Sequence, residues 1–126
     1  MILAKLAGAA LVVSVATGPM NEPDVAALRR MSLHQKNSAV QPLVRSATEC
    51  IARTVAATPG FRKEAPNENL GELIVASMPT CVAPVRAMID AYDRYFGEGT
   101  GEAFLMGPYL DVLPNAVSTW IVDRAD

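Results

Sequence analysis

Apolar side chains recur every three or four residues along most of the chain beyond residue 24. In the longest early run they fall at Val40, Leu43, Val44, Ala47, Ile51 and Val55. That spacing places them on one face of an α-helix. Pro42 is expected in the first turn of this helix, where its missing N–H costs least, with Ser38 or a neighbour as the cap. The sequence Thr58-Pro59-Gly60 is expected to end the helix.

A shorter helix is expected after the polar, unpatterned stretch 61–69, which we interpret as an exposed loop. Asn69 and Glu72 resemble a capping pair at its start, and Pro79 is expected to end it. Its apolar positions are Leu70, Leu73, Ile74 and Met78.

The most regular pattern opens at Thr80, with Pro84 in the first turn of a further helix. Its apolar stripe consists of Val85, Met88, Ile89, Tyr92 and Phe96. Gly97 stands at the C-terminal position that glycine favours. The glycine-rich segment 97–101 that follows is expected to be flexible.

Helical patterns are also expected towards both ends of the chain. Residues 21–24, Asn-Glu-Pro-Asp, resemble a helix start, and a last periodic stretch runs from Tyr109 to Ile121. Pro114 is expected to kink or divide that last helix. No alternation of period two and no internal repeat accompanies these patterns. The sequence therefore predicts an all-α fold, a compact bundle of four to five short helices.

The N-terminal segment has the order of a secretory signal peptide. Lys5 precedes a short uncharged apolar run that ends in small residues, and cleavage is expected after Ala16. The run is too short for a stable membrane span, which needs about 20 apolar residues. An ordinary buried helix is the alternative. On the first interpretation the chain divides into a signal peptide, 1–16, and a single helical domain, 17–126, in a periplasmic or secreted protein.

The chain contains two cysteines, Cys50 and Cys81. If the protein is exported, we expect them to form a disulfide that stabilises the fold by roughly 3–4 kcal/mol in the chain-entropy model. If it is not, two buried free thiols are the alternative. The two inferences depend on each other.

Composition narrows the functional classes. Hydrophobic residues make up 51% of the chain and charged residues only 19%, which excludes general disorder. The formal net charge is −2, and without residues 1–16 it becomes −3 because Lys5 is lost. Neither value provides the concentrated basic patch that nucleic acid requires, so no nucleic acid partner is expected.

Metal and cofactor chemistry find little support. His34 is the only histidine, and no C-x-x-C motif accompanies it. The glycine-rich segment lacks the lysine and the glycine spacing of a phosphate loop. No metal and no cofactor is therefore expected.

Four carboxylates form the best enzymatic candidate, namely Asp90, Asp93, Glu98 and Glu102. Two carboxylates in different environments act as acid and base in glycoside hydrolysis. A solvated helix face is the alternative, because Asp90 and Arg94 stand four positions apart and suit a surface ion pair.

Residues 104–109, Phe-Leu-Met-Gly-Pro-Tyr, form an apolar and aromatic stretch that we place in a connection between helices. Aromatic and methionine side chains are enriched at contact surfaces, although buried packing is the alternative. The candidate partner-binding or ligand-binding residues are Tyr92, Tyr95, Phe104, Met106, Tyr109 and Trp120.

Three functions follow as hypotheses, and an enzyme is the least favoured of them. The first is a non-enzymatic binding or interaction module whose partner is an envelope protein or a small apolar ligand. The second is a periplasmic acid or stress chaperone, by analogy of size and class alone. The third is a small hydrolase that uses the four carboxylates.

Overall fold

The structure, a computed structural model, describes residues 25–124, and within them it is entirely helical apart from turns and one loop. The predicted signal peptide lies outside the described residues. In chain order the elements are α2 (Val25–Arg29), α3 (Leu33–Ala57), α4 (Leu70–Ser77), the 3₁₀-helix η2 (Met78–Cys81), α5 (Val82–Phe96), α6 (Thr100–Phe104), the π-helix η3 (Leu105–Tyr109) and α7 (Leu110–Asp123).

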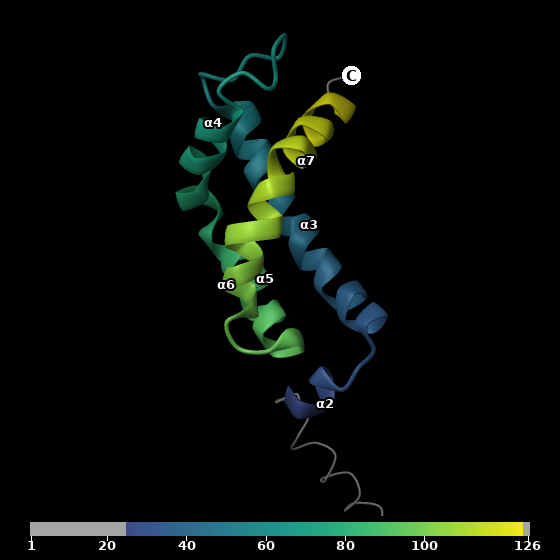
Figure 1. The fold of residues 1–126 in the computed structure, drawn as a ribbon. Coiled ribbons are helices and arrows are strands. Elements are labelled where there is room, and N and C mark those ends of the chain that lie inside the picture. Colours follow the sequence, from purple (N-terminus) through teal and green to yellow (C-terminus); the bar gives the residue numbers. More distant parts are fainter. Residues whose placement is uncertain (1–24, 125–126) are drawn as a thin grey trace, which may run out of the picture.

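These elements join into three long runs that lie antiparallel to one another. Figure 1 shows α3 leading to the 58–69 loop, α4 to α5 returning beside it, and α6 to α7 reversing direction again. The all-α bundle predicted from the sequence is confirmed.

Helix α3 begins earlier than the sequence pattern indicated. Ser32 caps it, because its hydroxyl accepts a hydrogen bond from the Gln35 backbone while the Gln35 side chain accepts one from the Ser32 backbone. Pro42 therefore lies inside the helix and not in its first turn, which corrects that prediction. The proline is exposed, so its ring faces solvent and not the core.

The second run starts at the predicted place but with different cap chemistry. Asn69 precedes α4 in the left-handed backbone region, with φ of 59°, and its side chain makes no capping hydrogen bond. The predicted Asn69–Glu72 capping pair is therefore wrong. Helix α4 ends at Ser77, and the chain tightens into η2, which contains Pro79, before it continues directly into α5, which ends before Gly97 as predicted.

The third run contains a π-helical segment at residues 105–109, which the sequence pattern placed in a connection between helices. Pro108 lies within it and lacks the N–H that the α pattern needs. Pro114 lies inside α7 without dividing it. Figure 1 shows the run changing direction between α6 and α7, so the bend expected at Pro114 falls at η3.

The core lies where α3, α5 and α7 meet, with α4 packed against one side. Its fully buried large side chains are Tyr109, Ile51, Met88, Leu113, Val55 and Val117. These are the apolar stripe positions of the predicted helices, so the periodicity identified the core faces correctly.

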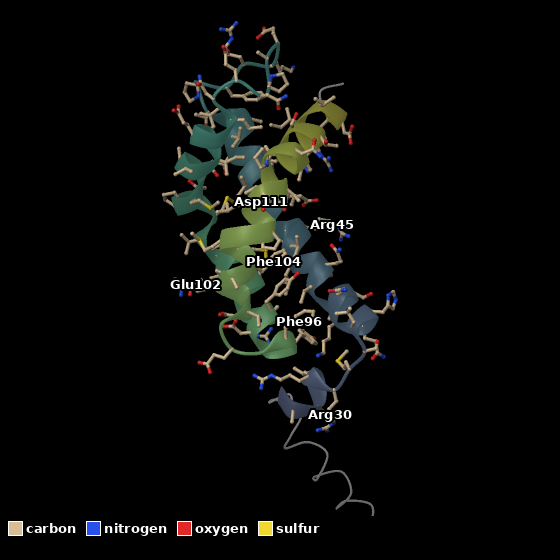
Figure 2. All side chains as sticks on the ribbon, viewed as in Figure 1. Arg30, Arg45, Phe96, Glu102, Phe104 and Asp111 are labelled. Carbon is tan, nitrogen blue, oxygen red and sulfur yellow. A yellow bond between two sulfur atoms is a disulfide. The ribbon has the colours of Figure 1, made fainter. Side chains whose placement is uncertain are left out.

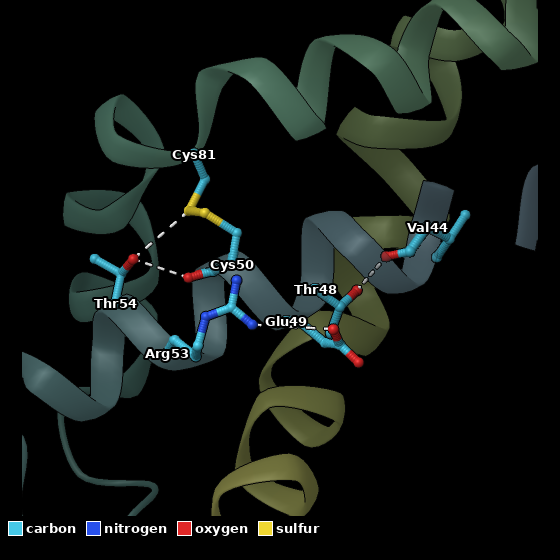
Figure 3. A network of polar contacts seen from close by, with 7 residues as sticks. All are labelled: Val44, Thr48, Glu49, Cys50, Arg53, Thr54 and Cys81. Carbon is cyan, nitrogen blue, oxygen red and sulfur yellow. Dashed lines mark hydrogen bonds and ion pairs between the residues drawn. A yellow bond between two sulfur atoms is a disulfide. The ribbon is translucent and has the colours of Figure 1, made fainter. Parts of the chain in front are cut away.

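Cys50 and Cys81 join α3 to the junction of η2 and α5. Their sulfur atoms lie 2.08 Å apart, at bonding distance, and their Cα atoms 5.9 Å apart. Cys81 is fully buried, and the Thr54 hydroxyl lies 3.6 Å from its sulfur (Figure 3). The predicted pairing of the two cysteines agrees with this geometry.

One helical run among residues 25–124, Leu70–Phe96, is long and apolar enough to cross a membrane on length and composition alone, with a mean hydropathy of 1.4. Core helices and signal sequences pass the same test. In this run 28% of the apolar window is buried, and the buried side chains of the run as a whole include Ile74, Cys81 and Met88.

Candidate functional site

Four aromatic rings form a continuous row across α5, α6 and η3. Tyr92 stacks on Phe96, one turn further along α5, at a centroid distance of 5.2 Å. On its other side it stacks on Phe104 of α6 at 4.2 Å. Phe104 in turn meets Tyr109, tilted by 39° at 5.5 Å. The row connects the surface to the core, because Tyr109 is 2% exposed whereas the other three rings are half-buried.

An open hollow of about 350 Å³ lies over the exposed side of this row, and we call it the aromatic groove. Its lining residues are Tyr92, Phe96, Thr100, Ala103, Phe104 and Pro108. The lining contains no charged residue. The Thr100 hydroxyl is already engaged with the carbonyl oxygens of Gly97 at 2.7 Å and Tyr92 at 3.0 Å. The groove therefore offers rings and aliphatic carbon to a ligand.

Helix α3 borders the same side of the molecule. Figure 2 shows Phe96 and Phe104 on the side of α5 and α6 that faces α3. The Lys36 ammonium lies 5.4 Å from the centre of the Phe96 ring, within the range of a cation–π contact. At the inner end of the row the Tyr109 hydroxyl shares a hydrogen bond of 2.8 Å with Thr48. The aromatic row is thus anchored to α3 at both ends.

The two tyrosines of the row are neutral at ordinary pH. Burial raises the pKa of Tyr92 above the usual 10.0. Burial also raises the pKa of Tyr109, and the hydrogen bond with Thr48 opposes part of that rise. The tyrosines therefore add no charge to the row, which favours uncharged or aromatic ligand surface, and the Lys36 ammonium over Phe96 is a charge at its outer end.

The turn between α5 and α6 fixes the two sides of the groove relative to each other. The Asp93 carboxylate accepts hydrogen bonds from the backbone N–H groups of Gly99, at 3.1 Å, and Gly101, at 2.8 Å. Gly97 and Gly99 have positive φ values of 121° and 89°. The glycine-rich segment is a bonded turn that leads into α6, which corrects the expectation of a flexible loop.

Gly101 allows α6 to touch the α5 backbone. A Cβ atom at this position would lie 2.2 Å from the carbonyl oxygen of Ile89. Only glycine permits this approach. The close contact brings Phe104, one turn later on α6, against Tyr92.

Three of the six predicted site residues come together, and three do not. Tyr92, Phe104 and Tyr109 belong to the aromatic row. Tyr95 and Met106 line neither the aromatic groove nor the two larger hollows described below, although Met106 is 64% exposed. Trp120 lies 11 residues beyond Tyr109, about 16 Å further along the helix axis, and lines a different hollow.

The sequence pattern placed Phe96 in the core stripe, included Pro108 only as part of the stretch 104–109, and gave no indication of Thr100 and Ala103 as groove residues. The spacing of Tyr92 and Phe96, four positions apart on one helix face, was the available signal for Phe96. Thr100 and Ala103 carry no such signal, because their position in the groove depends on the contact between α6 and α5.

The four candidate carboxylates do not form a shared site. Asp93 caps the turn, whereas Asp90 lines another hollow beside Arg86. Glu98 and Glu102 are exposed, and Glu102 lies on the far side of α6 from Phe104 (Figure 2). Within residues 25–124, no group of three histidine, cysteine or carboxylate residues is placed to hold a metal ion.

Two larger hollows lie elsewhere on the molecule. One of about 380 Å³ lies between α5 and Leu105, and its lining includes two charged residues, Arg86 and Asp90. The other, of about 530 Å³, lies between α7 and the 58–69 loop and is lined by both charged and aromatic side chains. The aromatic groove is the smallest of the three, but it is the one whose lining is aromatic and free of charge.

Comparison of the chain with protein-family models, curated proteins and solved structures gives no match.

Proposed function

We propose that this protein is a non-enzymatic binding module that holds an apolar ligand, or an apolar side chain of a partner, in the aromatic groove. The single observation that carries the proposal is the stacked row Phe96–Tyr92–Phe104, which forms the wall of an open hollow without any charged lining residue. Aromatic side chains at a surface supply large contact area at low entropic cost.

The stiffness of the groove supports this function. Asp93 and Gly101 hold α6 against α5, and the Tyr109–Thr48 hydrogen bond holds the inner ring against α3. A wall that is already ordered loses little conformational entropy on binding, which strengthens affinity. The size of the groove, about 350 Å³, suits one small ring system or one large apolar side chain.

A neutral apolar fluorophore tests the proposal without knowledge of the natural ligand. N-phenyl-1-naphthylamine carries no charge and becomes strongly fluorescent in apolar surroundings. We expect the protein to bind it saturably. Ala103→Glu places a charge at an exposed position of the groove and should weaken binding about tenfold, because the bound apolar probe would displace water from the new carboxylate.

Ala87→Glu is the matched control, since Ala87 is an exposed alanine of α5 that lines none of the three hollows. It should bind the fluorophore as the unmodified protein does. Equal binding by both variants would refute the groove as the binding site. The unfolding midpoints of both variants must also match the unmodified protein, so that lost binding is not lost folding.

Export is the second part of the proposal. Two observations support it, the signal-like order of residues 1–16 and the bonding distance between Cys50 and Cys81. Intact mass of protein recovered from the bacterial periplasm should match a chain that begins at Thr17 and weighs two hydrogens less than its reduced form. A full-length, reduced chain in that fraction would contradict both points.

The other two functions have less support. Asp93 is occupied by two backbone hydrogen bonds, and none of the three described hollows is lined by two of the four candidate carboxylates, which gives the hydrolase less support. The acid chaperone stays a prediction, tested by whether the protein suppresses a client's aggregation near pH 3.

A further inference from the structure

The largest of the three hollows described above lies at the opposite end of α7 from the aromatic row. We call it the Trp120 pocket; it has a volume of about 530 Å³, and its lining residues are Ala56, Phe61, Arg62, Lys63, Glu64, Trp120, Ile121 and Arg124. Figure 1 shows the 58–69 loop and the end of α7 at the same end of the molecule.

The lining combines apolar and cationic groups. Phe61 and Ile121 supply apolar surface, whereas three cationic side chains face one carboxylate, that of Glu64. Arg62 is paired with Glu68 at 3.7 Å. Within the described part of the chain Lys63 and Arg124 form no ion pair, so the pocket holds two unpaired cations and one carboxylate, that of Glu64. This local positive charge stands out in a protein with a net charge of −2.

The indole of Trp120 adds a second, independent observation. Its Nε1 is buried and has no hydrogen-bond partner among residues 25–124. A buried donor without a partner costs about 1–3 kcal/mol, and such groups in native proteins call for a water, an ion or a ligand. The Arg124 guanidinium lies over the indole ring, 4.3 Å from its centre, so one residue of the pocket brings a cation to the ring that carries the unpartnered donor.

We propose that the Trp120 pocket binds a small amphipathic carboxylate. The apolar body contacts Phe61 and Ile121, and the carboxylate accepts hydrogen bonds from Lys63, Arg124 and the Trp120 indole. The indole N–H is closed off from solvent, so binding at this donor includes a small movement of the pocket wall, to which the 58–69 loop contributes Phe61 and Lys63. That loop has no regular secondary structure and is joined to the rest of the chain by few hydrogen bonds.

Trp120 is the only tryptophan of the chain, so its fluorescence reports on this pocket alone. The probes are decanoate below its micelle concentration and N-acetyl-leucyl-phenylalanine, which presents the carboxylate of a peptide C-terminus. A saturable change in emission with decanoate assigns a fatty-acid-like ligand, and one with the dipeptide assigns a peptide end. Both results support the carboxylate site. No saturable change with either probe overturns it.

Charge variants show whether the carboxylate makes the expected contacts. Affinity is measured by calorimetry, because Arg124→Gln alters the indole surroundings directly. Lys63→Gln and Arg124→Gln should each weaken binding about two- to fivefold, as expected for partly exposed charges. Arg45→Gln, an exposed cation in the first half of α3, should have no effect.

Uncharged decanol is the control for apolar binding alone. Decanol should bind at least about fivefold more weakly than decanoate, and added salt should reduce the difference. Equal affinity for decanol and decanoate, or unchanged affinity in both charge variants, overturns the proposal. Ala103→Glu should not alter the change in Trp120 fluorescence. The experiments can therefore refute binding in the aromatic groove and binding in the Trp120 pocket independently.

Discussion

Gly101 is the residue on which the geometry of the aromatic groove depends most. Its missing side chain lets the backbone of α6 contact the carbonyl oxygen of Ile89 on α5. The Asp93 carboxylate holds the same turn through two backbone hydrogen bonds. The groove exists because one glycine and one carboxylate fix the start of α6.

Gly101→Ala is therefore expected to destabilise the protein by about 2–3 kcal/mol, because the new methyl group meets backbone that cannot move aside. Urea unfolding measures the change. The matched control is Gly107→Ala, since a Cβ there meets no atom within 4 Å. Its stability should stay the same or rise slightly. Equal stability of the two variants would show that α5 and α6 are not in contact at Gly101.

Tyr109 makes stability depend on pH in the alkaline range. Burial raises its pKa above the usual 10.0 in the folded protein, whereas the unfolded chain titrates near that value. The folded state thus holds a proton that the unfolded state has lost, so stability is complete below pH 10 and falls as pH rises beyond it. Tyr109→Phe should reduce the slope of unfolding free energy against pH from pH 9 to 11. An unchanged slope in this variant would contradict the burial of an ionisable phenol.

Residue-level prediction succeeded where a local pattern carries the information. The helix stripes identified Ile51, Met88 and Val117 as core, because burial follows helical periodicity. No local sequence pattern predicted the close approach at Gly101 or the two backbone hydrogen bonds that Asp93 accepts. They depend on which backbone atoms of α5 lie beside α6, a tertiary contact that local spacing does not encode.

At the scale of elements, the π-helical segment Leu105–Tyr109 sets the angle between α6 and α7. It adds one residue to the helical turn and thereby directs Phe104 to the aromatic groove while Tyr109 and Leu113 face the core. Such bulges are frequent at functional sites. This one connects the groove to the packed interior.

Deletion of Met106 should convert the segment to ordinary α-helix, and because the wide turn holds the one extra residue, the helix faces stay in register while the bend between α6 and α7 straightens. The packing of Tyr109 and Leu113 would then be disturbed, with an expected loss of about 1–3 kcal/mol in unfolding free energy. Met106→Ala is the control; the side chain is 64% exposed and should change stability by less than about 0.5 kcal/mol. A deletion variant as stable as the control would argue that the wide turn has no structural role.

The bond between Cys50 and Cys81 spans 31 positions and joins two of the three helical runs. Reduction should lower the free energy of unfolding by roughly 3–4 kcal/mol in the chain-entropy model. The double variant Cys50→Ser, Cys81→Ala should match the reduced protein, because Cys81 is buried and tolerates a small apolar side chain best. Urea unfolding of the unmodified protein with and without reductant measures the difference. Coincident curves under these two conditions would refute the stabilising role of the disulfide.

Element prediction failed mainly at boundaries and turns. Pro42 was taken as a helix start because proline favours first turns, but the Ser32–Gln35 capping box starts α3 earlier. Residues 97–101 were expected to be flexible because of their glycines, yet those glycines allow the positive φ values of a bonded turn. In both cases the general preference of proline or glycine predicted one local structure. Specific hydrogen bonds, those of the Ser32–Gln35 capping box and those of Asp93, produced another.

On the scale of the whole molecule, three antiparallel runs place two different hollows at different ends. The aromatic groove lies beside the turn from α5 to α6, and the Trp120 pocket lies beside the 58–69 loop. One lining is uncharged and the other is cationic. The predicted binding surface joined residues from both, because the sequence shows that Tyr109 and Trp120 share a helix but not how far apart they lie.

The central claim is that the aromatic groove binds apolar ligand, and NMR mapping of a neutral probe tests it most directly. The backbone amide signals of the oxidised protein are followed while N-phenyl-1-naphthylamine is added. We expect saturable shifts at Phe96, Thr100, Ala103 and Phe104, with the Trp120 indole signal unmoved. Shifts confined to other residues, or none at saturating probe, would contradict the claim.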